Sequence, residues 1–269
     1  MNDISVQLED LLGAARRLAV EAGDQIMEIY NNHDLDVTAK DDKSPLTAAD
    51  LAAHQIIKNG LEALAPKFPV LSEESNQLPF NTRASRPTYW LIDPLDGTRE
   101  FIKRNGEFTV NIALIHGHDA VLGVVAAPAK HLSYFACRGQ GAHKTVNGGE
   151  PTRIETRKLT PKQPVVAGSR SHAGDSLAAF LDKLGEHEMI SMGSALKFCL
   201  VAEGTVDIYP RFGPTSEWDT AAAQCVVEEA GGQVTSLELN RLRYNTKDSL
   251  LNPHFVVIGN PAYGWAKYF

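Results

Sequence analysis

Apolar residues recur with the period of a helix at the start of the chain. Between Leu8 and Ile29 they are spaced three and four residues apart, with charged residues on the opposite face. This pattern predicts an amphipathic helix of several turns. A second helix is predicted to begin at Pro45–Thr47, because proline suits the first turn of a helix and Ser44 can cap it.

Aromatic and β-branched runs then predict strands. Short strands are expected at 70–71 and 88–93, and we expect Pro94 to end the second one because proline has no N–H for a strand ladder. Three further runs, separated by glycine and His-Asp turns, predict an antiparallel meander at 108–115, 120–126 and 132–136.

The pattern changes after the polar, proline-containing stretch 157–164, where strands and helices begin to alternate. Strands are predicted at 165–168, 189–192, 206–209 and 255–258, and helices at 175–184, 195–203 and 217–230. The fold class predicted is therefore α/β, in two parts. An α+β domain of residues 1–160 precedes an α/β domain of residues 161–269.

Composition and charge restrict the class of protein. The chain has 269 residues, 43% of them hydrophobic and 22% charged, as is typical of soluble globular proteins. Its polar, acidic beginning predicts no signal peptide, and no stretch approaches the ~20 apolar residues of a membrane span. A net charge of −7 argues against a nucleic-acid partner. The three cysteines (Cys137, Cys199 and Cys225) form no ligand cluster, so we expect buried thiols in a reducing, cytoplasmic protein.

Three groups of acidic residues lie after predicted strands or at the start of a helix. Glu73 follows the first short strand, Asp93 and Asp96 follow the second, and Asp219 lies in the first turn of the helix at 217–230. Hard divalent cations prefer oxygen ligands, and α/β proteins bind ligands beyond the carboxyl ends of their strands. The four carboxylates balance the charge of two Mg²⁺ ions, and a substrate phosphate could recruit a third. Two such ions polarise a phosphate and lower the pKa of a bound water.

Gly97 and Thr98 fit the same site. Glycine lets the backbone approach a ligand closely, and Thr98 begins a short predicted helix at 99–103. Asp50 is a further acid that could orient a water together with Thr98.

The Asp-Pro-Leu-Asp-Gly-Thr run does not fit the familiar acidic motifs of unrelated proteins. A single Asp-x-x-Asp-Gly is usually a solvated turn, but here three acidic groups occur together. An EF-hand needs a glutamate at the twelfth loop position, which counted from Asp93 is Arg104. An aspartyl nucleophile of the haloacid-dehalogenase type needs acids two residues apart, and position 95 is leucine. No Walker A loop is present.

Three motifs in order along the chain resemble those of the inositol monophosphatase superfamily. They are Ser72-Glu73-Glu74, Asp93-Pro94-Leu95-Asp96-Gly97-Thr98 and Trp218-Asp219-Thr220-Ala221-Ala222. The resemblance implies a layered αβαβα fold and a Mg²⁺-dependent, Li⁺-inhibited phosphomonoesterase. It implies metal ligands at Glu73, Asp93, the Leu95 carbonyl, Asp96 and Asp219. It also implies that Thr98, Asp50 and Glu73 activate the attacking water.

Four further segments (101–111, 169–172, 193–197 and 209–215) resemble the bacterial 3′(2′),5′-bisphosphate nucleotidases of this superfamily. That similarity implies hydrolysis of adenosine 3′,5′-bisphosphate to AMP and phosphate, with its 5′-phosphosulfate analogue as a further substrate, and a role in sulfate assimilation. It also implies peripheral association with the cytoplasmic face of the inner membrane as an addition to the cytoplasmic location. The implied substrate contacts are Glu73, Leu95, Asp96, Gly97, Thr98, His172, Ser194, Lys197, Arg211 and Asp219.

The residues leave alternatives open. An inositol or sugar monophosphatase would use the same metal site, and a Ca²⁺- or Mg²⁺-binding module would use it without turnover. Lys103 and Arg104 are expected to be an exposed pair. A nucleotide with two phosphates needs cations beyond the metals, and His172, Lys197 and Arg211 are the candidates. The sequence is compatible with two or three Mg²⁺ ions per site, and with a monomer or a homodimer.

Overall fold

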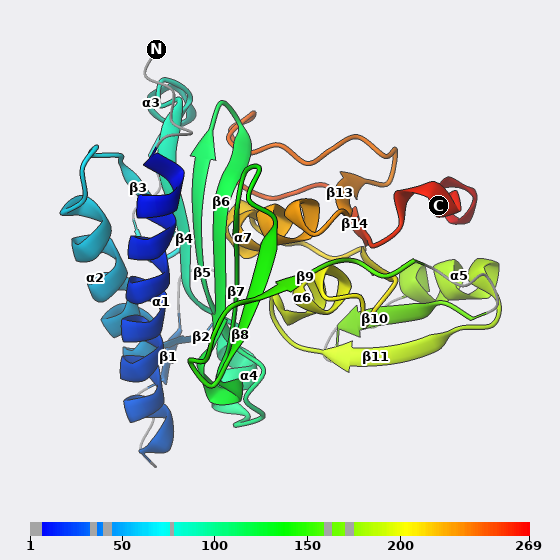
Figure 1. Ribbon diagram of the computed structural model, residues 1–269, viewed down its shortest axis with the longest axis horizontal. Coiled ribbons are helices and arrows are strands. Elements are labelled where there is room, and N and C mark those ends of the chain that lie inside the picture. The colour runs from blue at the N-terminus through cyan, green and yellow to red at the C-terminus, as the bar shows by residue number, and fades with distance from the viewer. Residues whose placement is uncertain (1–6, 33–36, 40–44, 76–77, 159–162, 170–174) are drawn as a thin grey trace.

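The structure is a computed structural model that describes residues 7–32, 37–39, 45–75, 78–158, 163–169 and 175–269. Two large β-sheets, of seven and five strands, alternate with three layers of helices (Figure 1), and the described residues also form a small two-stranded sheet. This arrangement confirms the α/β class and the layered αβαβα fold that the resemblance implied.

The first helical layer consists of α1 (Leu8–Asn31) and α2 (Ala48–Glu62). The apolar stripe of α1 is buried, as predicted. The predicted start of the second helix is wrong, because Pro45–Thr47 forms strand β2, which pairs with β1 (Val37–Ala39). Thr47 is extended (φ −118°, ψ 165°) and caps α2 instead. The expected cap, Ser44, lies outside the described residues.

A seven-stranded sheet forms the next layer, in the order β3-β4-β5-β6-β7-β8-β9. Its first two strands are parallel and the others pair antiparallel, which confirms the predicted meander. The short, partly polar strands β8 and β9 were not predicted. The strands are β3 (Val70–Ser72), β4 (Thr88–Asp96), β5 (Thr109–His116), β6 (Asp119–Ala127), β7 (Leu132–Cys137), β8 (Ala142–Val146) and β9 (Thr152–Ile154).

Strand β4 does not end at Pro94, contrary to the prediction, but continues to Asp96. Asp93 pairs with Asn111 and Asp96 pairs with Thr109, so β4 has one residue more than β5 over this interval. Pro94 lies in this bulge, where its missing N–H interrupts no regular ladder. Residues three apart in a regular strand point to opposite faces, and the extra residue allows both carboxylates to serve one site.

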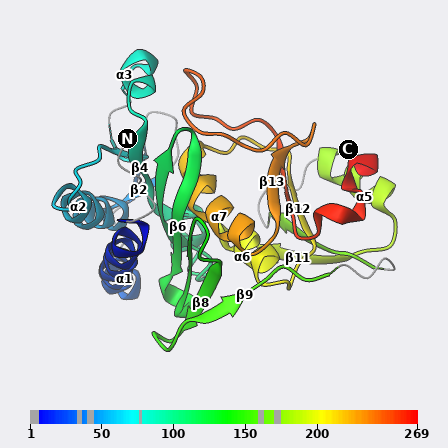
Figure 2. The same cartoon turned by 45° about the horizontal axis from the view of Figure 1, so that its top comes forward.

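Helices α6 (Leu196–Ala202) and α7 (Glu217–Glu229) lie between the two sheets (Figures 1 and 2). The second sheet has the order β11-β10-β12-β14-β13 and mixes parallel and antiparallel pairs. Its strands are β10 (Val165–Ser169), β11 (Glu188–Met192), β12 (Ile208–Arg211), β13 (Gln233–Ser236) and β14 (Phe255–Ile258). The alternation predicted for this half is confirmed, with β12 two residues later than expected and β13 not predicted.

The outer layer contains α5 (Asp175–Leu184) and two short 3₁₀ turns, η3 (Pro261–Tyr263) and η4 (Trp265–Tyr268). Phe180 of α5 packs with Trp265 and Ile258 in one apolar cluster. The remaining short elements lie in connections: α3 (Phe80–Ala84), α4 (Thr98–Ile102) and η2 (Pro128–Lys130).

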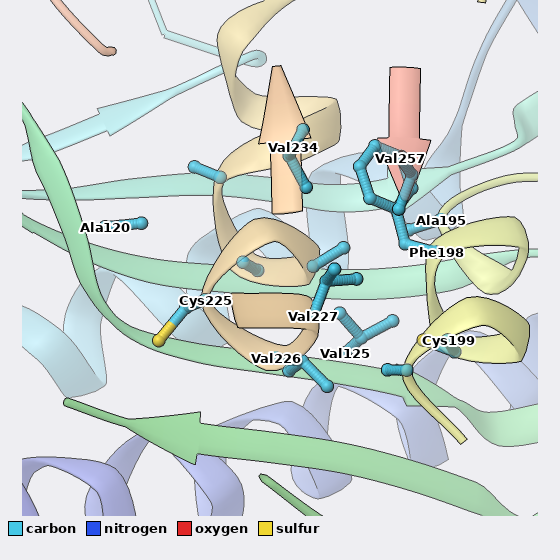
Figure 3. Packing of buried hydrophobic residues seen from close by; sticks show 14 of the residues in the cluster. Ala120, Val125, Ala195, Phe198, Cys199, Cys225, Val226, Val227, Val234 and Val257 are labelled. Atoms are coloured by element: carbon cyan, nitrogen blue, oxygen red, sulfur yellow. The ribbon is translucent and has the colours of Figure 1, made fainter. Parts of the chain in front are cut away.

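The largest apolar cluster surrounds α7. Figure 3 shows Val226 and Val227 of this helix between Val125 of the first sheet and Val234 and Val257 of the second. Both halves of the chain therefore contribute to one core. The predicted domain boundary at 160/161 lies outside the described residues and stays a prediction.

The three cysteines are buried and unpaired, as expected. Among the described helices, none combines the length and apolarity needed to cross a bilayer.

Candidate active site

Three carboxylates from separate elements converge at one end of the first sheet. Glu73, Asp93 and Asp219 each offer an oxygen within 4.8 Å of the other two. Glu73 follows β3, and its N–H donates to the Ile92 carbonyl of β4 (3.2 Å), so it lies beside Asp93. Asp219 comes from the first turn of α7, which the fold places between the sheets.

Asp96 lies beside this group and is held by the opposite half of the chain. Its Oδ2 accepts a hydrogen bond from the backbone N–H of Ala195 (2.6 Å), with the Thr109 hydroxyl and the Asn111 amide at 3.4 and 3.5 Å. Burial raises the pKa of Asp96 to about 6, although the charge of Lys197 and the Ala195 N–H oppose that shift.

The pKa of the Asp219 carboxyl is shifted in the same direction as that of Asp96. Burial, followed by the charges of Asp96 and Glu73, raises the pKa of Asp219 well above its ordinary value. Asp96 and Asp219, two neighbouring carboxyls with raised pKa values, form a site that a divalent cation would stabilise.

The donor set therefore fits a hard cation such as Mg²⁺. Of the donors that the resemblance implied, the structure brings the carboxylates of Glu73, Asp93 and Asp219 together, while Asp96 and the Leu95 carbonyl stay predicted donors.

Thr98 and Asp50 are joined at the edge of the carboxylate group. The Thr98 hydroxyl is 3.2 Å from Asp50 Oδ1 and 3.3 Å from the Leu95 carbonyl oxygen, and it donates to one of them. Asp50 is buried, and its other oxygen accepts from the backbone N–H and the hydroxyl of Thr47 (2.8 and 2.5 Å). This pair has the contact needed to orient a water.

Two of the site's acids also cap helices. Asp50 is the third residue of α2, and one of its oxygens accepts from the N-cap residue Thr47. Asp219 is the third residue of α7 and accepts likewise from the N–H of Ser216 (2.8 Å). Each carboxylate is thus fixed through one oxygen, which leaves the other oxygen directed elsewhere.

A cavity of about 130 Å³ adjoins the carboxylates. Its lining contains three acids and two cations: Asp96, Gly97, Glu100, Ser169, Gly193, Ser194, Ala195, Lys197, Phe198, Tyr209, Arg211, Thr215 and Asp219. Of the residues that the resemblance implied for substrate contact, six lie in this lining: Asp96, Gly97, Ser194, Lys197, Arg211 and Asp219. Glu73, Leu95 and Thr98 do not line it. His172 lies outside the described residues.

Lys197 is an unusually buried cation, with 5% of its surface exposed. Its ammonium donates to the Ser194 and Met192 carbonyls (2.6 and 3.2 Å) and lies 5.2 Å from the centre of the Tyr209 ring. Burial lowers the pKa of Lys197 to about 8, although the charge of Asp96 opposes this shift. The side chain therefore remains mostly cationic at neutral pH.

Arg211 and Ser194 retain hydrogen-bonding capacity toward the cavity. Arg211 donates to the Thr215 hydroxyl (2.9 Å) and the Pro214 carbonyl (3.1 Å), which uses two of its five N–H groups. The Ser194 hydroxyl is buried and has no partner among the described residues.

Gly97 shows why this position suits glycine. Its φ of +93° favours a residue without a side chain, and a Cβ there would lie 3.1 Å from the Glu107 carbonyl oxygen. Gly97 lies in the cavity lining, and its close approach to a bound ligand stays a prediction.

Several residues of the site were not singled out from the sequence. Glu107 and Asn111 lie in segment 101–111, and Tyr209 lies in segment 209–215, so similarity marked the segments without assigning a contact. The contact of the Ala195 N–H with Asp96 could not be predicted, because a backbone N–H is present at every residue except proline. Arg104 donates instead to the Tyr30 and Asn32 carbonyls, and both it and Lys103 are exposed, as expected.

Comparisons with known proteins agree with this geometry. Residues 7–261 match the model of the inositol monophosphatase family. The 3′(2′),5′-bisphosphate nucleotidase CysQ of Salmonella typhimurium is 49% identical over 242 residues, which cover 90% of this chain and 96% of that protein. The protein of the same name from Escherichia coli K12 is 49% identical over 248 residues, covering 92% and 99%. The crystal structure of CysQ from Bacteroides thetaiotaomicron has a TM-score of 0.81 and 40% identity, covering 94% of this chain and 98% of that one.

Proposed function

Because this chain belongs to the inositol monophosphatase family, we propose that it is a Mg²⁺-dependent phosphatase that converts adenosine 3′,5′-bisphosphate to AMP and phosphate. One observation carries the choice of substrate. A single cavity joins the acids Asp96 and Asp219 to the cations Lys197 and Arg211. The relatives named 3′(2′),5′-bisphosphate nucleotidase support the same choice.

The substrate has two phosphates, and the site offers two environments for them. The 3′-phosphate would occupy the carboxylate side, where Mg²⁺ bound by these acids supplies positive charge that neutralises and polarises the phosphate. The 5′-phosphate would lie near Lys197 and Arg211. A buried ammonium and a guanidinium with unused N–H groups are suited to a dianion.

The protein's own part in catalysis starts at Thr98. While its hydroxyl donates to Asp50, its lone pairs remain able to accept a hydrogen bond from a water, which orients that water toward the phosphorus. As the new O–P bond forms, the water's proton passes through the Thr98 hydroxyl to Asp50. The bond from phosphorus to the 3′-oxygen breaks, that oxygen takes up a proton from solvent water to become the hydroxyl of AMP, and Asp50 returns its proton to the solvent.

The proposal extends to the cell. The 5′-phosphosulfate analogue carries the same 3′-phosphate and is a second proposed substrate. The proposed role is to clear adenosine 3′,5′-bisphosphate formed during sulfate assimilation, in the cytoplasm and in peripheral contact with the inner membrane. Cell fractionation tests the location.

A substrate comparison tests the function. Phosphate release is measured from adenosine 3′,5′-bisphosphate, inositol 1-phosphate and fructose 1,6-bisphosphate, with Mg²⁺, without it, and with added Li⁺. We expect the nucleotide to have the highest kcat/KM, together with Mg²⁺ dependence and Li⁺ inhibition. A preference for inositol phosphate or fructose bisphosphate would instead identify a sugar monophosphatase, and no release with any substrate would indicate a binding module.

Matched variants make the comparison specific. Lys197→Ala and Arg211→Ala should raise the KM of the nucleotide by about tenfold or more, the cost of one lost charged hydrogen bond. Their effect on inositol phosphate should be smaller. Unchanged nucleotide KM in both variants would argue against the assigned phosphate environment.

A further inference from the structure

One turn connects the two sides of the candidate active site. Gly193, Ser194 and Ala195 run between β11 and α6. The Ala195 N–H donates to Asp96 (2.6 Å), a carboxylate of the metal side. The Ser194 carbonyl accepts from the Lys197 ammonium (2.6 Å) on the substrate side. The position of this turn therefore affects both groups at once.

Glu107 fixes this turn from the other half of the chain. It precedes β5, and its side chain is buried with 6% exposed. Its Oε2 accepts from the N–H of Gly193 (2.8 Å). Gly193 is buried, so losing this acceptor would leave its N–H without a partner, and a buried donor left unpaired is costly.

The fit between Glu107 and the turn is also steric. A Cβ on Gly193 would lie 2.7 Å from the Glu107 carbonyl oxygen and 2.9 Å from both Glu107 Cβ and Glu100 Cγ. Ser194 next to it has a φ of +45°, a conformation that non-glycine residues seldom adopt. Such a conformation persists where the surroundings determine it, and the Gly193 contacts supply that constraint.

We propose that Glu107 is a positioning residue, whose carboxylate sets the 193–195 turn and through it the places of Asp96 and Lys197. The proposal rests on the proposed function for its substrate side. Glu107 does not itself line the cavity. It acts through the turn, so its loss should impair metal binding and recognition of the second phosphate together.

Two substitutions distinguish the effect of the length of the Glu107 side chain from the effect of its charge. Glu107→Gln keeps the length of the side chain and an oxygen that accepts from Gly193. Glu107→Asp keeps the charge but is one methylene shorter, so it withdraws the acceptor. Glu150→Gln and Glu150→Asp serve as matched controls, because Glu150 is exposed in the connection between β8 and β9.

The expected result is a pattern across substrates. Glu107→Asp should raise the KM of adenosine 3′,5′-bisphosphate about tenfold, which corresponds to one misplaced charged contact. It should also raise the half-saturating Mg²⁺ concentration, and it should change the KM of adenosine 3′-monophosphate, which lacks the second phosphate, by a smaller factor. Glu107→Gln should stay within about twofold of wild type, because the acceptor remains in place.

Two results would overturn the proposal. The first is a Glu107→Asp variant whose activity falls equally with both nucleotides and no more than its lower melting temperature explains. The second is a Glu107→Gln variant that is as impaired as Glu107→Asp. A wild-type enzyme that ignores the bisphosphate but hydrolyses p-nitrophenyl phosphate would refute the proposed function alone. In that case the half-saturating Mg²⁺ concentration of the Glu107 variants would be measured with that ester. An unchanged value in Glu107→Asp would refute the positioning role.

Discussion

Binding a metal requires the charged form of Asp96, whereas burial favours its neutral form. It is a proposed metal ligand, yet burial raises its pKa to about 6 in the metal-free protein. Asp96→Asn should therefore lower kcat by about 10³-fold or more, since a charged metal ligand is lost. The melting temperature of the metal-free protein should not fall, because an amide has no charge to bury. Steady-state kinetics and thermal unfolding in EDTA measure the two effects, and near-normal turnover would contradict the assignment of Asp96 as a ligand.

The ammonium of Lys197 predicts a pH effect on binding. Burial lowers its pKa to about 8, so it is cationic below that pH and becomes neutral above it. The KM for adenosine 3′,5′-bisphosphate should therefore rise as the pH passes from about 7 to about 9. In Lys197→Arg the cation persists throughout this range, and the rise should disappear even if the KM itself is higher. A pH profile of KM that is the same in both proteins would contradict a role for Lys197 in substrate binding.

At the scale of elements, the site depends on how closely α7 approaches β6. Gly123 of β6 faces the backbone of α7, and a Cβ there would lie 2.1 Å from the Ala222 carbonyl oxygen. Gly123→Ala should push the helix away and destabilise the fold by about 2 kcal/mol or more. Because Asp219 belongs to the same helix, Mg²⁺-dependent activity should fall as well.

Gly13 of α1 provides the matched control. A Cβ there meets only the end of the Arg17 side chain, at 3.6 Å. Gly13→Ala should stabilise the protein by about 0.5–1 kcal/mol, since glycine is a poor helix former. Urea unfolding of both variants measures the difference, and equal effects of the two substitutions would show that the contact of β6 with α7 is not the cause.

At the scale of the whole molecule, bound metal should join the two halves of the chain. Glu73 and Asp93 come from the first sheet and Asp219 from α7, so Mg²⁺ should stabilise the folded state over the unfolded one. The pKa of Asp96 is raised in the folded state, so the folded protein binds a proton here more tightly than the unfolded chain does. The metal-free protein should therefore lose stability as the pH rises from about 4 through about 6. Asp219 is shifted in the same direction.

The increase in melting temperature on adding Mg²⁺ should therefore be larger at about pH 7.5 than at about pH 5, where protons compete for the same carboxylates. Differential scanning fluorimetry with EDTA or excess MgCl₂ measures it. An increase that is equal at both pH values would contradict the involvement of these two acids.

Local patterns determined most of the elements. The apolar stripe of α1, the meander of β5 to β7 and the alternation after residue 165 were visible in the sequence, because each depends on periodicity and turn residues that are close in the chain. The same holds for the acidic motifs, whose oxygen-rich chemistry already indicated a divalent cation and a phosphate. β2 and the continuation of β4 past Pro94 could not be predicted, since they depend on pairing with β1 and on a bulge opposite β5.

What only the tertiary structure decided is how distant residues meet. The contact of Ala195 with Asp96 spans 99 positions of the chain, and that of Glu107 with Gly193 spans 86. Such contacts arise when two sheets pack on α6 and α7, a process governed by burial of shared apolar surface rather than by any local signal. The sequence by itself therefore determined which groups are available for the proposed chemistry. The packing determined that Asp96, Asp219 and Lys197 lie around one cavity, and that a single turn contacts both Asp96 and Lys197.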